Sequence, residues 1–465
     1  MDYENYLSPF SWRYGSPDMR HIWSEHNKRL LWRKIWVALA ETQAEYGLIS
    51  PEDVNELRQH SQEIDLPAAL ALEAEIHHDL MAELKTYAAQ CPQAGRILHL
   101  GATSMDIEDN ADALRIQQSL QLLENRLRLL LQAFAKRIEE TAELPIMAFT
   151  HLQPAEPTTL GYRLSSYAQD LLSDWQTLRQ LKRELRGKGF KGAVGSAAAY
   201  AELMGESQLD AFEQRLSAHL GLSFFPITTQ TYPRKQEYTL LAALAGLGAS
   251  LYKFCFDLRL LQSPPIGECS EPFGARQVGS SAMPFKRNPI QAEKVDSLAR
   301  LLAQMPAVAW QNAAHSLLER TLDDSANRRS LLPESFLICD EILLTTTRLI
   351  NGLQINTAAI QRNLAIYGPF AATERILMAL VKAGADRQQM HEHLRQHALQ
   401  AWQAIQNGQA NPLQDNLLND ALLSTYVDNE SLRTLLHAEQ HLGFAPTRAR
   451  RMAALIRQSI EEGLP

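Results

Sequence analysis

Cysteine is scarce in this chain of 465 residues, and its arrangement excludes two kinds of small scaffold. The four cysteines, Cys91, Cys255, Cys269 and Cys339, lie far apart, and none belongs to a CxxC pair. A disulfide framework or a zinc ribbon needs closely spaced cysteines. We therefore expect reduced thiols and a reducing, cytoplasmic compartment.

The chain also lacks an excess of positive charge. It has 45 Lys and Arg residues against 53 Asp and Glu residues, which gives a formal net charge of -8. Binding to DNA or RNA without sequence preference requires a positive field. We expect no nucleic-acid partner, and any bound anion must be held by a local cluster of cations.

Long hydrophobic runs are missing as well. The most apolar stretch, 240–252, ends at Lys253, and it is shorter than the roughly 20 residues that span a bilayer. The first ten residues carry Asp2 and Glu4 and no apolar run, unlike a secretory or transit peptide. The sequence therefore predicts no membrane partner.

Helical periodicity, in contrast, is abundant. Residues 102–144 contain no Gly or Pro, and their apolar residues recur at steps of three and four: Ile116, Leu120, Leu123, Leu127, Leu130, Phe134 and Ile138. Residues 162–186 and 334–351 are also free of Gly and Pro. In 290–332 only Pro306 intervenes, and we expect it to kink a helix without ending it.

This pattern predicts an all-α protein of three domains. We expect an N-terminal helical domain over 1–103, a central bundle of long helices over 104–356, and a C-terminal helical domain over 357–465. Such long apolar faces exceed what one thin bundle covers, so we expect burial between subunits.

The segment "GSSAMPFKRNP" (279–289) interrupts the helical pattern. The glycine permits an unusual backbone, Ser280 and Ser281 place two hydroxyls side by side, and Pro284 and Pro289 keep the chain out of regular helix. We expect a loop that carries hydroxyls and a cation into the next helix. Taken alone, such a loop is more often an ordinary polar connection.

Histidines stand out at three places. His151 lies in proline-marked chain ahead of a long helix, where a cap or core role is commoner than acid or base chemistry. His77 and His78 precede Asp79 in an expected helix, where neighbours diverge by about 100° and cannot share a metal ion; hydrogen-bonding or relay roles fit better.

The third place is a pair on another expected helix. His393 and His397 are four residues apart, the spacing of a helical metal pair. No third ligand is apparent in the sequence, so a solvated helix face is the favoured interpretation.

A cluster of cations lies in "LERTLDDSANRRSLL" (318–332). It contains Arg320, Ser325, Arg328 and Arg329, beside two aspartates and just before a helical run. A solvated charge cluster is one interpretation. The other is a phosphate site, because guanidinium groups beside a serine and a helix N-terminus suit a phosphate.

Six motifs together resemble the adenylosuccinate lyase family of the aspartase/fumarase superfamily. In chain order they are "HHDLMA", "LGATSMDIEDN", "FTHLQP", "QTYPRK", "SSAMPFKRNP" and "ERTLDDSANRR". The resemblance implies a homotetramer that needs no cofactor or metal. It also implies a β-elimination that releases fumarate from two nucleotides, adenylosuccinate (giving AMP) and SAICAR (giving AICAR).

The resemblance also implies the catalytic residues. Ser280 matches the general base and His151 the general acid, while His78 matches a second site histidine. Lys286 and Asn288 stand where they stabilise the doubly charged aci-carboxylate formed when carbon loses its proton.

The remaining matched positions are expected to bind substrate. Arg13, Tyr14, Arg320, Ser325 and Arg329 match residues that hold the phosphate and ribose. The others are Asp79, Thr103, Ser104, Gln230 and Ser281, with Thr103, Ser104 and Gln230 at positions for the succinyl carboxylates. His77 and Lys294 depart from the family pattern, because related chains carry Arg or Asn at the first and Arg at the second.

Two alternatives remain open. One is another superfamily lyase that acts on a related succinyl or carboxylate substrate. The other is a helical scaffold that has lost activity, and the intact Ser280, His151 and Lys286 count against it.

Overall fold

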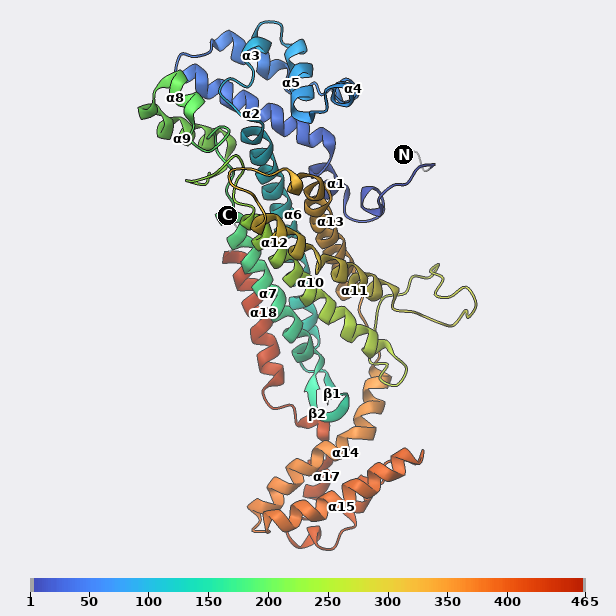
Figure 1. Ribbon diagram of the computed structural model, residues 1–465. Helices are drawn as coiled ribbons and strands as arrows, with labels where there is room; N and C mark the ends of the chain where they lie inside the picture. The colour runs from blue at the N-terminus through green and yellow to red at the C-terminus, as the bar shows by residue number, and fades with distance from the viewer. Residues whose placement is uncertain (1–3, 463–465) are drawn as a thin grey trace. The chain divides into compact units, whose positions relative to one another are not determined.

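The computed structural model describes residues 4–462, and helices dominate it (Figure 1). The all-α prediction is confirmed. The longest helices are α6 (Ser104–Glu140), α7 (Leu160–Glu184), α10 (Lys235–Gln262), α13 (Asp323–Asn351) and α14 (Thr357–Lys382). The first two occupy the predicted segments 102–144 and 162–186, and α13 contains the predicted segment 334–351.

The described chain divides into two compact units, each made of three segments. Unit 1 comprises the chain up to Leu127 together with 174–249 and 297–344, and unit 2 comprises 128–173, 250–296 and the chain from Thr345 onward. The predicted boundaries coincide with the starts of α6 and α14. The division into three domains stays a prediction.

The first helices of unit 1 begin where serines and prolines predict. Ser16 and Ser50 accept hydrogen bonds from backbone N–H groups of the first turns, and a proline follows each of them. The helices of this part are α1 (Pro17–Ile22), α2 (Glu25–Glu45), α3 (Pro51–His60), α4 (Leu66–Ile76), α5 (Asp79–Gln90), α8 (Ala198–Met204) and α9 (Leu209–Leu220), with short 3-10 turns η1 (Pro9–Ser11), η2 (Ala94–Ile97) and η3 (Glu206–Gln208).

The core of unit 1 forms around α2. Its Trp36 and Ile35 are fully buried with Tyr87 of α5 and Phe212 of α9. Residues of α6, including Ile107, join the same cluster. This packing fixes the N-terminal end of α6, which carries predicted site residues.

Unit 2 contains a β-hairpin and the C-terminal helices. Strand β1 (Pro145–Thr150) pairs antiparallel with β2 (Gln153–Thr159), and a second small sheet joins β3 (Cys269–Ser270) to β4 (Gln354–Ile355). The helices are α15 (Arg387–Gln406), α16 (Leu413–Leu418), α17 (Asn429–Leu436) and α18 (Ala445–Glu462), with turns η4 (Leu423–Thr425) and η5 (Ala438–Gln440). Leu380, Met390 and Leu417 lie in their shared core.

One proline prediction is wrong. Pro306 does not kink one helix: the chain forms α11 (Ile290–Leu302) and α12 (Met305–Ala314), with irregular chain before α13. Pro306 lies in the first turn of α12, where a missing N–H costs little. Pro333, in contrast, lies inside α13 without ending it.

The four cysteines are buried and free, as expected. The apolar run 240–252 belongs to α10, which is longer than the run. Helices α10 and α14 both have the length and composition of a membrane span. In the most apolar 18-residue stretch of each helix, 44% and 39% respectively is buried. Core helices of soluble proteins have the same properties, so this observation places neither helix in a bilayer.

Candidate active site

His151 lies in the turn of the β1–β2 hairpin. Thr150 pairs with Gln153, so His151 and Leu152 form a two-residue turn, and their φ angles are 52° and 59°. Such turns favour Asn-Gly, because both residues take the left-handed conformation. A leucine there costs about 1–2 kcal/mol, and strain of this kind is concentrated at functional sites.

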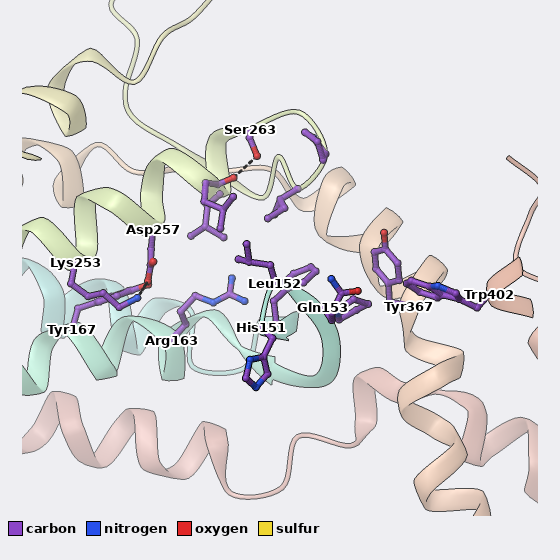
Figure 2. Close-up of a pocket in the computed structure, with 16 residues that line it drawn as sticks. His151, Leu152, Gln153, Arg163, Tyr167, Lys253, Asp257, Ser263, Tyr367 and Trp402 are labelled. Atoms are coloured by element: carbon purple, nitrogen blue, oxygen red, sulfur yellow. Dashed lines mark hydrogen bonds and ion pairs between the residues drawn. The ribbon is translucent and has the colours of Figure 1, made fainter. Parts of the chain in front are cut away.

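A cavity of about 690 Å³ adjoins this hairpin within unit 2 (Figure 2). Tyr367 and Trp402 stand together on one side of it, with ring centroids 6.4 Å apart. On the other side the Tyr167 hydroxyl donates to Asp257 at 2.6 Å, and Lys253 pairs with the same carboxylate. Burial, reinforced by Asp257, raises the pKa of Tyr167 well above its ordinary value, so this hydroxyl stays a neutral donor.

The imidazole of His151 is exposed and turned away from Gln153 in Figure 2. Arg163, which also lines the cavity, is paired with Glu268 at 3.1 Å and donates to the Met147 carbonyl. No described residue of the 279–289 loop lines this cavity. His151 and Ser280 are therefore not brought together around it.

The 279–289 segment is a loop, as predicted, and α11 begins directly after Pro289. Figure 1 draws it as part of a long yellow-green loop ahead of α11. Its glycine serves a close approach and not a left-handed backbone: a Cβ at Gly279 would lie 2.1 Å from the Lys286 carbonyl oxygen. The Asn288 side chain donates to the Gly279 carbonyl at 3.1 Å and so ties the two ends of the loop together.

Within this loop Ser280 has a defined environment. Its Oγ accepts hydrogen bonds from the backbone N–H groups of Met283 at 3.0 Å and Ala282 at 3.3 Å. Ser281 and Lys286 are exposed. The loop therefore places two N–H groups beside the Ser280 oxygen.

The His77–Asp79 segment departs from the expected helix. Helix α4 ends before His77, which has a φ of 57°, and α5 begins at Asp79. His78 is the N-cap of α5, since its Nδ1 accepts from the Met81 N–H at 3.4 Å. In neutral His78 the proton is therefore on Nε2, which makes this exposed nitrogen a hydrogen-bond donor.

Asp79 links this segment to the cation cluster within unit 1. One oxygen accepts from the Leu80 N–H at 2.8 Å, and the other accepts from Arg329 at 3.1 Å. Asp79, Ser325 and Arg329 line one pocket of about 120 Å³. Arg329 keeps 59% of its side chain exposed, so most of its guanidinium surface remains accessible.

Arg328 has a different role from Arg329. It is buried, pairs with Glu237 at 2.6 Å, and also contacts Asp112 at 2.9 Å. Arg234 extends this network by pairing with Asp109 at 2.9 Å. Both arginines of the "RR" pair line the pocket, but the buried Arg328 also fixes α13 inside unit 1, whereas Arg329 is exposed.

The pocket residues that were not singled out from the sequence include Lys28, Glu108, Asp112 and Arg115. Burial, reinforced by neighbouring aspartates, raises the pKa of Glu108 to about 8. Burial opposes ionisation of Asp112, but Arg115 and Arg328 outweigh it and lower the pKa of that carboxyl to about 2. The positions 108, 112 and 115 share one helical face, and this spacing was the available signal.

Thr103 and Ser104 lie at the N-terminal end of α6. The Thr103 N–H donates to the Asp106 carboxylate at 3.0 Å, and Lys188 pairs with Asp106 in a fully buried contact. The Lys191 N–H also donates to Asp106, at 3.2 Å. The glycine-rich segment 187–200 is therefore attached to the start of α6.

The remaining predicted residues occupy separate places. Arg13 is exposed, and the Tyr14 ring packs against Phe10 in a tilted contact with centroids 5.7 Å apart. The Gln230 N–H donates to the Glu319 carbonyl at 3.2 Å, next to Arg320. Burial lowers the pKa of Arg320, which faces Asp324 at 3.8 Å. Lys294 lies half-buried in α11.

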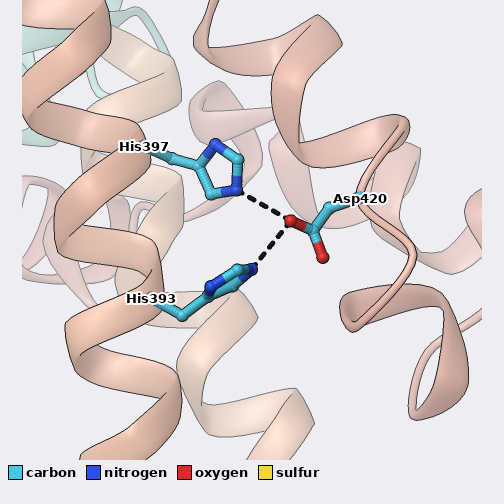
Figure 3. Close-up of side chains that lie close together, drawn as sticks. All are labelled: His393, His397 and Asp420. Carbon is cyan, nitrogen blue, oxygen red and sulfur yellow. Dashed lines mark hydrogen bonds and ion pairs between the residues drawn. The ribbon is translucent and has the colours of Figure 1, made fainter.

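One cluster outside these segments has metal-ligand chemistry. His393 and His397 of α15 lie beside Asp420, and the three ligand atoms lie within 4.8 Å of one another (Figure 3). The expectation that this histidine pair lacks a third ligand is wrong. No spacing in the sequence pointed to Asp420, because it follows α16 and reaches the histidine pair only through the fold.

Comparisons with known proteins agree with the motifs. A family model described as "Lyase" matches residues 14–302, and one described as "Adenylosuccinate lyase C-terminus" matches 369–452. The chain is 40% identical over 441 residues to adenylosuccinate lyase of Schistosoma mansoni, covering 92% of both chains. It is 37% identical over 453 residues to that of Saccharomyces cerevisiae, covering 96% of this chain and 93% of the relative.

Solved structures share the fold. The 3-carboxy-cis,cis-muconate lactonizing enzyme from Pseudomonas putida superposes with a TM-score of 0.85 at 25% identity, covering 97% of this chain and 99% of that one. Its name denotes a different reaction, so the fold by itself does not define the chemistry. The sequence relatives and the two family models do: this chain belongs to the adenylosuccinate lyase family and is a carbon–nitrogen lyase.

Proposed function

We propose that this protein releases fumarate by β-elimination from adenylosuccinate, giving AMP, and from SAICAR, giving AICAR. The observation that carries the proposal is the environment of Ser280, whose Oγ accepts two backbone N–H groups in the 279–289 loop. The same N–H groups stabilise the alkoxide form of the serine. That form is the base which an elimination at carbon requires.

Ser280 removes the proton from the carbon beside a succinyl carboxylate. The product of this step carries two negative charges on the carboxylate, and fixed cations and hydrogen-bond donors lower its energy. Lys286 is one of two neighbouring cations of the loop, with Arg287, and its ammonium has no side-chain partner among the described residues. Asn288 holds the loop in shape through Gly279.

The pocket around Arg329 is suited to the nucleotide phosphate. Arg329 and Ser325 offer donors, while Glu108 is largely neutral below pH 8 and adds little repulsion. A phosphate entering the pocket replaces Asp79 on Arg329 and gains charge-assisted hydrogen bonds. The outward Nε2–H of His78 and the exposed Arg13 complete the phosphate contacts of this proposal.

The N-terminal end of α6 is suited to a succinyl carboxylate. Helix N-termini present backbone N–H groups and a positive dipole end to anions, and Thr103 and Ser104 add hydroxyls there. The buried Lys188–Asp106 pair holds this end in place. Gln230 contributes an amide to the same substrate group in this assignment.

His151 donates a proton to the leaving nitrogen. Its exposed position on a strained turn agrees with a group that projects toward a substrate held elsewhere. We infer that the protein is a cytoplasmic homotetramer in which several subunits build each site. Large apolar side chains exposed on helices support burial between subunits: Leu129, Phe256, Trp310 and Leu455.

Ser280→Ala tests the base. The variant should lose the ultraviolet change that accompanies conversion of adenylosuccinate while it still binds AMP, because the missing group acts on the transition state. Ser281→Ala is the matched comparison on the neighbouring hydroxyl and should keep more activity. If Ser280→Ala keeps more than about a tenth of the wild-type rate, a loss below roughly 1.4 kcal/mol, Ser280 is not the base.

Subunit mixing tests the shared site. His151→Ala and Ser280→Ala proteins should each be inactive. After dissociation, equal mixing and random reassembly, roughly a quarter of the sites should receive both intact residues from different chains. No recovery of activity, with subunit exchange confirmed independently, would show that both residues come from one chain.

A further inference from the structure

The cluster of His393, His397 and Asp420 lies within unit 2, and none of its three residues is assigned to the lyase reaction. The Nε2 atoms of the two histidines lie 2.7 and 2.8 Å from the same oxygen, Oδ2 of Asp420. The two rings are perpendicular, with centroids 5.0 Å apart. Figure 3 shows both rings directed at that one oxygen.

The chemistry of these groups is that of a transition-metal site. Two imidazole nitrogens and one carboxylate oxygen are a common ligand set for Zn²⁺ with an open fourth position. The two histidines, spaced i and i+4, present their nitrogens from one helical face. Ligand atoms each about 2.0 Å from a tetrahedral ion are about 3.3 Å apart. Small side-chain rotations would lengthen the distances from the two Nε2 atoms to Oδ2 to this value and make room for the ion.

The carboxylate is already oriented for this role. The other oxygen of Asp420 accepts hydrogen bonds from the N–H groups of Leu422 at 2.9 Å and Leu423 at 3.0 Å. Such second contacts hold a ligand in place and raise metal affinity. In the described chain Asp420 forms no ion pair with Lys or Arg, so a bound cation would not have to displace one.

The cluster is also accessible. Side-chain exposure is 28% for His393, 19% for His397 and 10% for Asp420. An ion can therefore enter from solvent, and a water molecule can occupy the remaining position. The site is neither buried among apolar residues nor spread over a fully solvated face.

We propose that His393, His397 and Asp420 bind a divalent transition-metal ion, with Zn²⁺ as the natural occupant. The ion joins α15 to the connection between α16 and η4, which otherwise touch through the apolar core that includes Met390 and Leu417. It stabilises the C-terminal helices and takes no part in the elimination. An ion that binds only the folded chain raises its stability by mass action.

Zinc binding to the full-length protein tests this proposal. Untagged wild-type protein is stripped with a chelator, dialysed and titrated with Zn²⁺ by calorimetry, and we expect one ion per chain and a higher thermal midpoint. His397→Gln and Asp420→Asn should each weaken binding by about a hundredfold, because loss of even an outer partner costs 10- to 100-fold. The Asn variant keeps an oxygen for the Leu422 and Leu423 N–H groups.

His391→Gln is the matched control, since His391 is an exposed histidine of the same helix. It should bind Zn²⁺ like the wild type. Co²⁺ serves as a spectroscopic probe: four-coordinate Co²⁺ should give a visible absorption band in the wild type and the control, and in neither ligand variant. Equal zinc affinity in the wild type and His397→Gln would overturn the proposal, as would equal loss in His391→Gln.

Discussion

Replacing His151 and Leu152 by Asn and Gly should make the protein both more stable and inactive. Both residues have positive φ angles in the turn of the hairpin. Asn-Gly is the sequence that such a turn favours. The native residues therefore lower the free energy of unfolding. The exchange should raise it and remove the proposed acid, His151.

The magnitude follows from the turn itself. Leu152→Gly relieves about 1–2 kcal/mol of left-handed strain, which raises the free energy of unfolding. The greater freedom of glycine in the unfolded chain lowers it by about 0.5–1 kcal/mol. Leu152 is 70% exposed, so little buried apolar area is lost. His151→Asn adds a few tenths of a kcal/mol, because Asn tolerates the left-handed conformation. Together the two substitutions should raise the free energy of unfolding by about 1 kcal/mol.

Urea unfolding followed by circular dichroism measures the stability, and conversion of adenylosuccinate measures the activity. Loss of a general acid typically lowers the rate by about 10²- to 10⁴-fold. Leu152→Gly alone separates the effects, because it relieves strain and keeps His151. Leu318→Gly is a stability control in another loop, where a leucine also has a positive φ of 46°.

Two results would refute this reasoning. If the double variant is no more stable than the wild type, the turn stores no strain. If it keeps more than about a tenth of the wild-type turnover, His151 is not the proton donor.

Three further predictions concern unit 1. Arg329→Ala should raise the Michaelis constant about 10- to 100-fold, because the substrate loses a charged hydrogen bond. Arg300 is an exposed arginine on α11, and Arg300→Ala should leave the Michaelis constant unchanged. Unchanged inhibition of Arg329→Ala by AMP would remove Arg329 from the phosphate site. The pKa of Glu108 is raised from 4.5 to about 8, so the folded state holds a proton that the unfolded state loses in this window, and stability should fall as pH rises from 4.5 to 8. Glu108→Gln should flatten that decline in urea midpoints, and an unchanged profile would show that Glu108 titrates normally. Lys188→Met leaves the buried carboxylate of Asp106 without its cation and should cost about 3–5 kcal/mol of unfolding free energy; a loss below about 1 kcal/mol would mean that the pair is not buried as the structure has it.

Local patterns predicted the helices well because their causes are local. The absence of Gly and Pro, the steps of three and four, and the Ser-Pro caps act within a few residues of each helix. Pro306 and Pro333 show the limit of such reasoning. Both sit in sequence that is otherwise helical, and their different outcomes depend on position within a turn and on packing.

The environment of each site residue depended on contacts distant in sequence. The motif identified Ser280, but which N–H groups its oxygen accepts follows from the folded loop. The carboxylate facing His393 and His397 comes from a connection beyond α16. The pairing of Lys188 with Asp106 joins residues 82 positions apart. Spacing rules do not reach that far along a chain.

Backbone strain offers an independent argument against an inactive scaffold. The described residues other than glycine that have positive φ angles are His77, His99, His151, Leu152, Ala197 and Leu318. Three of them, His77, His151 and Leu152, belong to or immediately adjoin predicted site residues, and Leu318 lies two residues before Arg320. Each left-handed residue costs roughly 1–2 kcal/mol unless it is Gly or Asn, and such strain persists where geometry is needed for function. A chain that served only as a helical support would gain stability by replacing these residues. Their retention beside His78, His151 and Arg320 favours a protein whose turns hold reactive groups in place.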